Sequence, residues 1–149
     1  MNKKKCIIVD IDGTLMDISK RVAAKRPFIV NEEDLHFYDL DVPKPQTAKV
    51  VDMFANDGYD IIFCSGRTEI GRIQTAKQII HALNLTGSGT QLFMRTDGDC
   101  RGDDIVKSEM LAKIQETHDV FLVLDDRDRV VNFWRSQGLV CWQVAPGAF

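Results

Sequence analysis

The hydrophobic residues of this chain are grouped in short runs that end abruptly at polar residues. The first run is Ile7 to Val9, and further runs cover residues 59–64, 91–95, 120–124 and 139–144. Short apolar runs with few polar interruptions are typical of strands that are buried on both faces. The pattern therefore predicts the strands of a parallel sheet.

Between these runs, apolar residues recur at helical spacing. Helices are predicted over residues 45–55, 70–84 and 104–117 and from about residue 130. Pro45 suits the first turn of its helix, and a turn is predicted at Gly87-Ser88-Gly89. Because strands alternate with helices, we expect an α/β fold: a doubly wound three-layer sandwich with a central parallel sheet and right-handed crossovers.

Residues 15–45 interrupt this alternation with a segment that is rich in charged and aromatic residues and has little periodicity. Long connections of this kind inside a compact domain are often functional. Two interpretations remain open. The segment either covers or lines a site at the end of the first strand, or it is a solvated loop with one short helix.

Length and charge narrow the class of protein. The 149 residues have the size of a single domain, residues 1–149, with a core of its own. A net charge of -3 argues against a broad basic face that coats duplex nucleic acid, but not against binding of a strand end. The run Cys6 to Val9 after three lysines is too short for a secretory signal or a membrane span. We therefore expect a cytoplasmic protein without a membrane contact.

The cysteines and histidines carry no recognisable metal pattern. The 4 cysteines are widely scattered without a C-x-x-C pair, which favours buried thiols in a reducing compartment over a zinc site. The 3 histidines share no spacing with them. Gly87-Ser88-Gly89 lacks the Lys-Ser/Thr pair that follows a nucleotide P-loop.

The first strand ends in two carboxylates. Asp10 and Asp12 are two residues apart, so they point the same way on an extended chain, and Gly13 lets the backbone turn away. Two close carboxylates repel each other, and one pKa rises unless a cation intervenes. The pair therefore indicates Mg²⁺, a shared proton, or both, although Asp-Gly by itself is a common turn signal.

Polar clusters recur at the ends of the predicted strands or at a helix start. They are Asp10/Asp12, Ser65/Arg67, Asp103/Lys107 and Asp125/Asp126. The carboxyl ends of parallel strands form the edge of a sheet where ligands bind. Two acidic pairs at that edge favour Mg²⁺, a hard cation that prefers oxygen ligands. Added to a lysine, an arginine and the hydroxyls of Ser65 and Thr14, they are the groups that phosphoryl transfer requires.

Each cluster also has an ordinary structural explanation. Alone, Lys107 is a surface lysine, Ser65-Gly66-Arg67 is a turn, and Asp103 is a helix N-cap. Asp125-Asp126 alone caps the helix that follows. The functional interpretation is favoured because all of these positions fall at strand ends or a helix start in one chain.

The clusters resemble the four motifs of the haloacid dehalogenase (HAD) superfamily of phosphotransferases, in the same order. The motifs are Asp10-Ile-Asp12-Gly-Thr14, Ser65, Lys107 and Asp125-Asp126. A closer similarity, over nearly the whole chain, is to the 3'-phosphatase domain of bacteriophage polynucleotide kinase-phosphatase. That similarity is most specific at Ser65-Gly66-Arg67, 103–107, 124–127 and the tail 141–149.

The resemblance implies a HAD-like fold with a small insertion after the first strand instead of a large cap domain. It implies a phosphatase that stands alone, because no P-loop kinase segment is present, and that acts in the host cytoplasm if it is phage-encoded. Its substrates would be DNA or RNA strand ends, in nucleic acid end repair. The sequence gives no signal of oligomeric state.

The resemblance also implies residue roles. Asp10 attacks phosphorus, and Asp12 acts as general acid and then general base. Mg²⁺ is held by Asp10, the backbone carbonyl of Asp12 and the pair Asp125/Asp126, with the direct ligand of that pair left open. Lys107 holds phosphoryl oxygens. Further substrate contacts are assigned to Thr14, Ser65, Gly66, Arg67 and Asp103.

The family also uses an arginine after the first motif. Its distance from Asp12 favours Arg21, whereas the Arg-Pro-Phe context favours Arg26.

Three functions are compared. The leading one is a Mg²⁺-dependent phosphomonoesterase that removes a 3'-phosphate from DNA or RNA ends, with or without opening 2',3'-cyclic phosphates. The second is a phosphatase for free nucleotides or another small phosphate ester. The third is a receiver domain phosphorylated on aspartate. Receivers place the acidic pair early and the acceptor aspartate in the middle of the chain, whereas this chain has an acidic pair late and Cys64 ends the middle strand.

Overall fold

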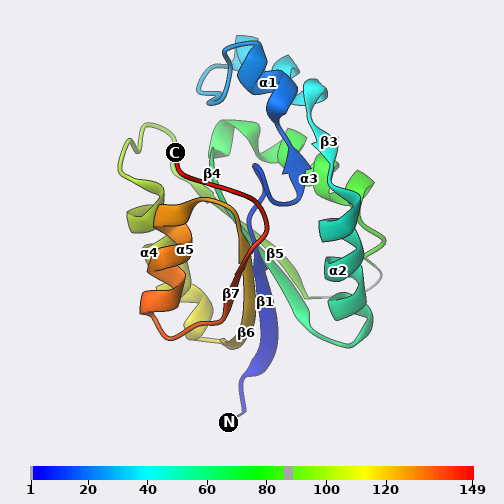
Figure 1. Ribbon diagram of the computed structural model, residues 1–149, viewed down its shortest axis with the longest axis vertical. Helices are drawn as coiled ribbons and strands as arrows, with labels where there is room; N and C mark the ends of the chain where they lie inside the picture. The colour runs from blue at the N-terminus through cyan, green and yellow to red at the C-terminus, as the bar shows by residue number, and fades with distance from the viewer. Residues whose placement is uncertain (1, 86–88) are drawn as a thin grey trace.

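A computed structural model describes residues 2–85 and 89–149 of the chain. Its centre is a sheet in the order β5-β4-β1-β6-β7, in which all neighbouring strands are parallel (Figure 1). The strands are β1 Lys4–Val9, β4 Asp60–Thr68, β5 Thr90–Arg95, β6 His118–Asp125 and β7 Cys141–Gln143. The predicted parallel sheet is confirmed.

Helices cover both faces of this sheet, as the alternating pattern predicted. Helices α2 (Pro45–Asn56) and α3 (Arg72–Ala82) pack on one face, and α4 (Asp103–Gln115) and α5 (Asp128–Ser136) pack on the other (Figure 1). The molecule is therefore the three-layer α/β sandwich expected for a HAD-like chain. Among the described residues, no helix is both long enough and apolar enough to cross a bilayer.

Strand β1 supplies residues to both cores. Cys6 and Ile8 point into the core formed with α4 and α5, whereas Ile7 and Val9 point into the core formed with α2 and α3. All of these residues are fully buried. Alternate residues of a strand face opposite sides, so a central strand between two helical layers needs apolar residues at every position. This explains the uninterrupted run at the start of the chain, and it places the residue after Val9 at the edge of the sheet between both layers.

The irregular segment folds into a small insertion over the carboxyl edge of the sheet. It contains β2 (Met16–Asp17) and β3 (Val42–Pro43), which pair antiparallel, helix α1 (Ser19–Ala23) and the 3₁₀ helix η1 (Glu32–Leu40). Figure 1 shows it at the top, beyond the ends of β1 and β4. Its residues Arg21 and Tyr38 are buried, so it covers this edge and is not merely a solvated loop.

Two predicted boundaries were wrong. Ser65-Gly66-Arg67, expected to follow a strand as a turn, lies inside β4. Ser65 pairs with Met94 and Thr68 with Arg95, so two residues bulge out of the ladder between them. A bulge re-aims polar side chains without ending the strand. Helix α3 begins at Arg72, after the 3₁₀ turn η2 (Glu69–Gly71). Of the predicted turn at Gly87-Ser88-Gly89, the first two residues lie outside the described residues.

Replacement of a core aromatic residue should be costly. Phe63→Ala removes a fully buried ring from the core beside α2 and α3, and we expect it to lower the free energy of unfolding by about 3–5 kcal/mol. Phe28→Ala removes a ring that is 71% exposed and should change it by about 0.5 kcal/mol or less. Urea unfolding measures both, and similar losses in the two variants would contradict this core assignment.

Candidate active site

Three carboxylates meet at the carboxyl edge of the sheet. Asp10 directly follows β1, Asp125 ends β6, and Asp126 follows it. Val9 pairs with Leu124 in the neighbouring strands, and the Asp10 N–H donates to the Leu124 carbonyl at 3.0 Å. One oxygen from each carboxylate lies within 4.8 Å of the others, and all three residues are buried. The two acidic pairs of the sequence therefore contribute to one cluster, as expected for adjacent parallel strands.

Lys107 is the cation of this cluster. It projects from α4 and is 2% exposed. Its Nζ donates to Asp10 Oδ1 at 2.8 Å and to Asp125 Oδ2 at 2.9 Å. The Thr14 hydroxyl donates to Asp10 Oδ2 at 3.0 Å and lies 3.5 Å from Asp126 Oδ1. Lys107 and Thr14 therefore lie where the sequence predicted, against the residue proposed to attack phosphorus.

The two carboxylates after β6 differ in how many partners they already have. Asp125 accepts the Asp126 N–H on Oδ1 at 2.8 Å, and on Oδ2 it accepts Lys107 and, at 3.0 Å, Trp134 Nε1. Among the residues that the structure describes, the Asp126 carboxylate has the long contact to Thr14 and an interaction with the Asp10 carboxylate. Asp126 is therefore the freer donor for a cation, whereas Asp125 mainly holds Lys107. The sequence gave Trp134 no such role, because it also fits the apolar face of its helix.

Burial and repulsion disturb the ionisation of this cluster. Burial, and then the charge of Asp125, raises the pKa of Asp10 well above its usual range, although Lys107 opposes the shift. Burial and Asp125 also raise the pKa of Asp126. For Lys107, burial lowers the pKa, but the carboxylates of Asp10 and Asp125 outweigh it and raise that pKa well above its ordinary value. Three carboxylates facing one ammonium leave a surplus of negative charge.

These residues fit a hard divalent cation. The donors are carboxylate oxygens, they lie close together, and the surplus negative charge of the cluster raises the pKa of Asp10. Mg²⁺ uses one or two carboxylates and completes its shell with waters and substrate phosphate. Asp10 and Asp126 offer the least occupied oxygens for such an ion.

Gly13 allows the chain to turn next to Asp126. Its φ is +81°, a conformation that favours glycine. A Cβ at this position would lie 2.1 Å from Asp126 Oδ2. Both the turn after the first motif and the closeness of the late aspartate therefore require glycine.

Asp12 lies in a different environment from Asp10. Its Oδ1 accepts Arg21 Nη2 at 2.9 Å, Arg67 Nε at 2.9 Å and Arg67 Nη2 at 2.6 Å. Burial raises the pKa of Asp12, but Arg67 and Arg21 outweigh burial and lower it. The bulge in β4 and the helix α1 of the insertion thus supply the two guanidinium groups that hold this carboxylate.

A second buried carboxylate, Asp41, holds the same two arginines. Arg21 Nε donates to its Oδ1 at 3.0 Å, and Arg67 Nη2 donates to its Oδ2 at 2.9 Å. Burial raises the pKa of Asp41 despite these partners. The ring of Tyr38 lies 4.9 Å from the Arg21 guanidinium carbon and 4.3 Å from that of Arg67. We call Asp12, Arg21, Asp41 and Arg67 the arginine clamp.

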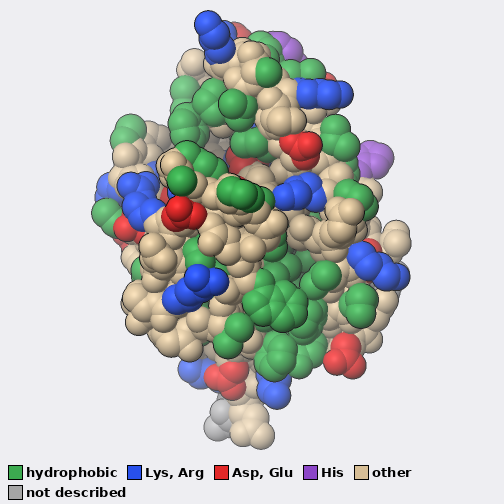
Figure 2. Space-filling model, viewed as in Figure 1, with side chains coloured by type: hydrophobic (Ala, Val, Ile, Leu, Met, Phe, Trp, Pro, Cys, Tyr) green, Lys and Arg blue, Asp and Glu red, His purple; other side chains and the backbone are tan. Residues whose placement is uncertain are grey.

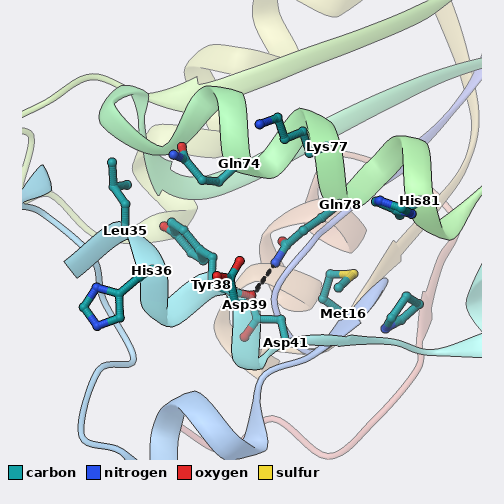
Figure 3. A pocket seen from close by; sticks show the side chains of 11 residues that line it. Met16, Leu35, His36, Tyr38, Asp39, Asp41, Gln74, Lys77, Gln78 and His81 are labelled. Atoms are coloured by element: carbon teal, nitrogen blue, oxygen red, sulfur yellow. Dashed lines mark hydrogen bonds between the residues drawn. The ribbon is translucent and has the colours of Figure 1, made fainter. Parts of the chain in front are cut away.

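Gln78 of α3 contacts the arginine clamp, and a cavity lies beside it. Gln78 donates to the Tyr38 carbonyl at 2.8 Å, and its Oε1 accepts Arg67 Nη1 at 2.6 Å. Figure 3 shows Gln78 extending from α3 toward Asp41. A cavity of about 780 Å³ between η1 and α3 is lined by Tyr38, Asp41 and Gln78, but not by Asp10 or Lys107. The sequence missed Tyr38 and Asp41, because residues 15–45 have no period that separates buried from exposed positions. It missed Gln78 because the spacing of this residue on its helix also fits solvent exposure.

The structure distinguishes the two candidate arginines of the insertion. Arg21 is fully buried and reaches Asp12. The Arg26 side chain donates to the Lys25 carbonyl at 3.0 Å and lies over the Phe37 ring at 5.2 Å. Arg26 contacts Arg21 through its main chain: its carbonyl accepts Arg21 Nη1 at 3.3 Å, and its N–H donates to the Arg21 carbonyl at 3.0 Å. The position favoured by distance from Asp12 is therefore the one whose side chain contacts the Asp12 carboxylate.

The other predicted residues, Ser65, Gly66 and Asp103, lie in β4 and at the start of α4. Ser65 Oγ is buried and accepts the Arg67 N–H at 3.1 Å. A Cβ on Gly66 would lie 2.6 Å from Asp103 Oδ1, so a side chain at this position would displace that carboxylate. Asp103 itself is not the N-cap of α4, which is Gly102. Its carboxylate pairs with Arg95 and, at 2.9 Å, with Arg127.

Other proteins share this fold. Over residues 4–149 the chain matches the family model described as the polynucleotide kinase PNKP phosphatase domain. A solved structure of a Pnkp1/Rnl/Hen1 complex contains a chain that is 31% identical, with a TM-score of 0.83 over 99% of this chain. A Pnkp1/Rnl/Hen1 RNA repair complex contains one that is 32% identical, with a TM-score of 0.80 over 99%.

A class C acid phosphatase from Bacillus anthracis, solved with tungstate bound, shares the fold at 16% identity, with a TM-score of 0.62 over 99% of this chain and 68% of its own.

Together, the fold and the acidic site define a phosphatase of the HAD superfamily. More narrowly, the chain belongs to the family of PNKP phosphatase domains. It spans only 48% and 44% of the two Pnkp1/Rnl/Hen1 chains that it matches. Family membership rejects the receiver interpretation.

Replacing the two arginines should have unequal effects. Arg21→Ala removes one of the two buried guanidinium groups that bind Asp41 and Asp12 and leaves Arg67 as their remaining cation, and we expect it to lower the free energy of unfolding by about 3 kcal/mol or more. It should also lower phosphatase activity at least about 100-fold through misplacement of Asp12. Arg26→Ala should lower stability by about 1 kcal/mol or less. Denaturant unfolding and phosphate release measure these effects, and a larger loss in Arg26→Ala would contradict the assignment.

Proposed function

We propose that this chain is a Mg²⁺-dependent phosphomonoesterase that removes the 3'-phosphate from DNA or RNA ends through an aspartyl phosphate on Asp10. The observation that carries the proposal is the buried group of Asp10, Asp126 and Lys107. Family membership supports a polynucleotide end as substrate. The preference for the 3' end rests on the similarity to phage 3'-phosphatase domains.

Asp10 and Asp126 would hold the ion, together with the backbone carbonyl of Asp12. When bound, Mg²⁺ supplies positive charge that offsets the carboxylates and the substrate phosphate. Lys107 and Thr14 orient the Asp10 carboxylate through its two oxygens. Lys107 also adds a buried positive charge next to the phosphoryl group.

The first step forms a bond between an Asp10 oxygen and phosphorus and breaks the bond from phosphorus to the 3'-oxygen. Asp12 gives a proton to that departing oxygen, which leaves as the 3'-hydroxyl. In the second step, Asp12 takes a proton from water as the water oxygen bonds to phosphorus. The Asp10–phosphorus bond breaks, and inorganic phosphate and the free carboxylate result.

The arginine clamp explains how Asp12 is aimed and when it is protonated. Both guanidinium groups bind Oδ1 of Asp12, which leaves Oδ2 to carry the proton. Without substrate, Arg67 and Arg21 lower the pKa of Asp12 and keep it ionised. A phosphate dianion that enters the site opposes these positive charges and raises that pKa. Asp12 therefore becomes a usable acid when the site is loaded.

Release of phosphate from matched oligonucleotide ends tests the substrate and the metal. We expect release from a 3'-phosphorylated strand in Mg²⁺, release at least about 100-fold slower from a 5'-phosphorylated strand, and little release after chelation. A nucleoside 3'-monophosphate is the control for the alternative substrate class. Equal release from both ends, or release unaffected by chelator, would falsify the proposal. Faster turnover of the mononucleotide than of the strand would favour the free-nucleotide alternative.

Replacement of the nucleophile should separate chemistry from folding. Asp10→Asn keeps the shape of the side chain but removes the charge that attacks phosphorus, and we expect turnover to fall more than about 1,000-fold. Circular dichroism should show an unchanged fold. Asp119→Asn, at an exposed position of β6, is the matched control and should retain activity. Substantial turnover by Asp10→Asn would remove Asp10 from the reaction.

A further inference from the structure

The end of the described chain crosses the loop that carries two of the clustered carboxylates. After β7, residues 143–149 run back over residues 125–128. Figure 1 shows this segment in red, continuing beyond β7 toward the edge of the sheet where the insertion lies. We call residues 143–149 the C-terminal strap. Its similarity to phage sequences made it one of the most specific parts of the chain, but the mechanism above gives it no role.

The strap forms hydrogen bonds with successive residues of this loop, mainly with their backbone groups. The Val144 N–H donates to the Asp125 carbonyl at 3.0 Å, and the Asp128 N–H donates to the Gly147 carbonyl at 2.9 Å. Gln143 Nε2 donates to the Asp126 carbonyl at 2.9 Å and to Asp128 Oδ1 at 2.6 Å. The carbonyl groups of both acidic residues are therefore held from the same side.

Gly147 packs directly on the backbone of the loop. A Cβ at Gly147 would lie 1.8 Å from the Asp126 carbonyl oxygen and 2.6 Å from the Arg127 Cα. Because both neighbours are backbone atoms, no side-chain rotation can make room. The strap continues to Phe149, whose ring lies 4.9 Å from the Arg127 guanidinium carbon. The strap therefore contacts the loop from the last residue of β6 to the first residue of α5.

We infer that the C-terminal strap sets the affinity of the site for its divalent cation, with Gln143 and Gly147 as positioning residues. This inference rests on the proposed function, because it assumes that Asp126 binds Mg²⁺. Asp126 has few side-chain hydrogen bonds to fix its carboxylate, so its direction depends on the backbone that carries it. Outer contacts that orient a metal ligand typically change metal affinity by about 10–100-fold. The strap supplies these contacts through the main chain.

Trp134 provides a direct report of metal binding. Its Nε1 donates to Asp125 Oδ2 at 3.0 Å, so a cation in the cluster should change its emission. The chain has 2 tryptophans, and Trp142 is 53% exposed. In a Trp142→Phe background, a fluorescence titration with Mg²⁺ therefore follows Trp134 alone. The Mg²⁺-dependent shift of the thermal unfolding midpoint gives an independent reading.

Two strap variants are compared with two controls in this background. Gln143→Met removes both side-chain hydrogen bonds at constant length, and Gly147→Ala forces the strap off the loop. Gln137→Met alters an exposed residue at the end of α5, outside the strap, and Ala148→Val alters an exposed strap residue other than the two positioning residues. We expect both strap variants to bind Mg²⁺ about 10-fold or more weakly, and both controls to bind it as the parent does. Gln143→Met decides the question if Gly147→Ala does not fold.

The outcomes separate the strap from the proposed function. If the parent protein shows neither an emission change nor a midpoint shift with Mg²⁺, the metal site itself is wrong, and the strap inference falls with it. If the parent binds Mg²⁺ and the strap variants bind it equally well, the inference is wrong but the function stands. If the strap variants are less stable but bind Mg²⁺ with unchanged affinity, the inference is also wrong, because the strap then stabilises the fold without affecting the metal site.

Discussion

The repulsion among Asp10, Asp125 and Asp126 is the constraint on which the site depends. Parallel pairing of β1 with β6 brings their carboxyl ends together, and both ends are acidic. Taking such charges out of water is costly unless they are paired. The fold partly offsets this cost with Lys107 from α4 and the Trp134 N–H from α5. The two helices that cover one face of the sheet therefore also balance the charge at its edge.

Asp10 and Asp12 are two residues apart, but their environments oppose each other. Asp10 faces other carboxylates, which raise its pKa, whereas Asp12 faces two arginines, which lower its pKa. In the absence of ligands, the raised pKa of Asp10 disfavours the ionised carboxylate proposed as nucleophile. The lowered pKa of Asp12 disfavours the protonated carboxyl proposed as general acid. In the proposed mechanism, a cation beside Asp10 and a phosphate beside the arginines would oppose these shifts.

The sequence predicted the acidic cluster well, because its members sit at strand ends and the geometry of parallel strands brings such ends together. Lys107 was predicted by its place in the order of motifs. Asp41, Trp134 and Gln78 could not be predicted. Asp41 lies in an aperiodic insertion, and the other two lie on helices where their spacing also fits packing or solvent exposure. Asp103 was assigned a substrate contact by the resemblance, with a helix cap as its ordinary structural explanation, and its pairing with Arg95 and Arg127 gave no signal in the sequence.

The insertion is attached to the sheet in an unusual way for a folded segment. Its two longest buried side chains, Arg21 and Tyr38, are polar or amphipathic, and Asp41 ties them to Arg67 in β4. Buried ion pairs of defined geometry fix the position of the insertion on the sheet with only a few residues. Exposed residues of the insertion such as Phe28 and Val30 are therefore replaceable as long as these anchors persist. An enzyme built this way can acquire new substrate preferences by exchange of one surface segment, without rebuilding the core that performs the chemistry.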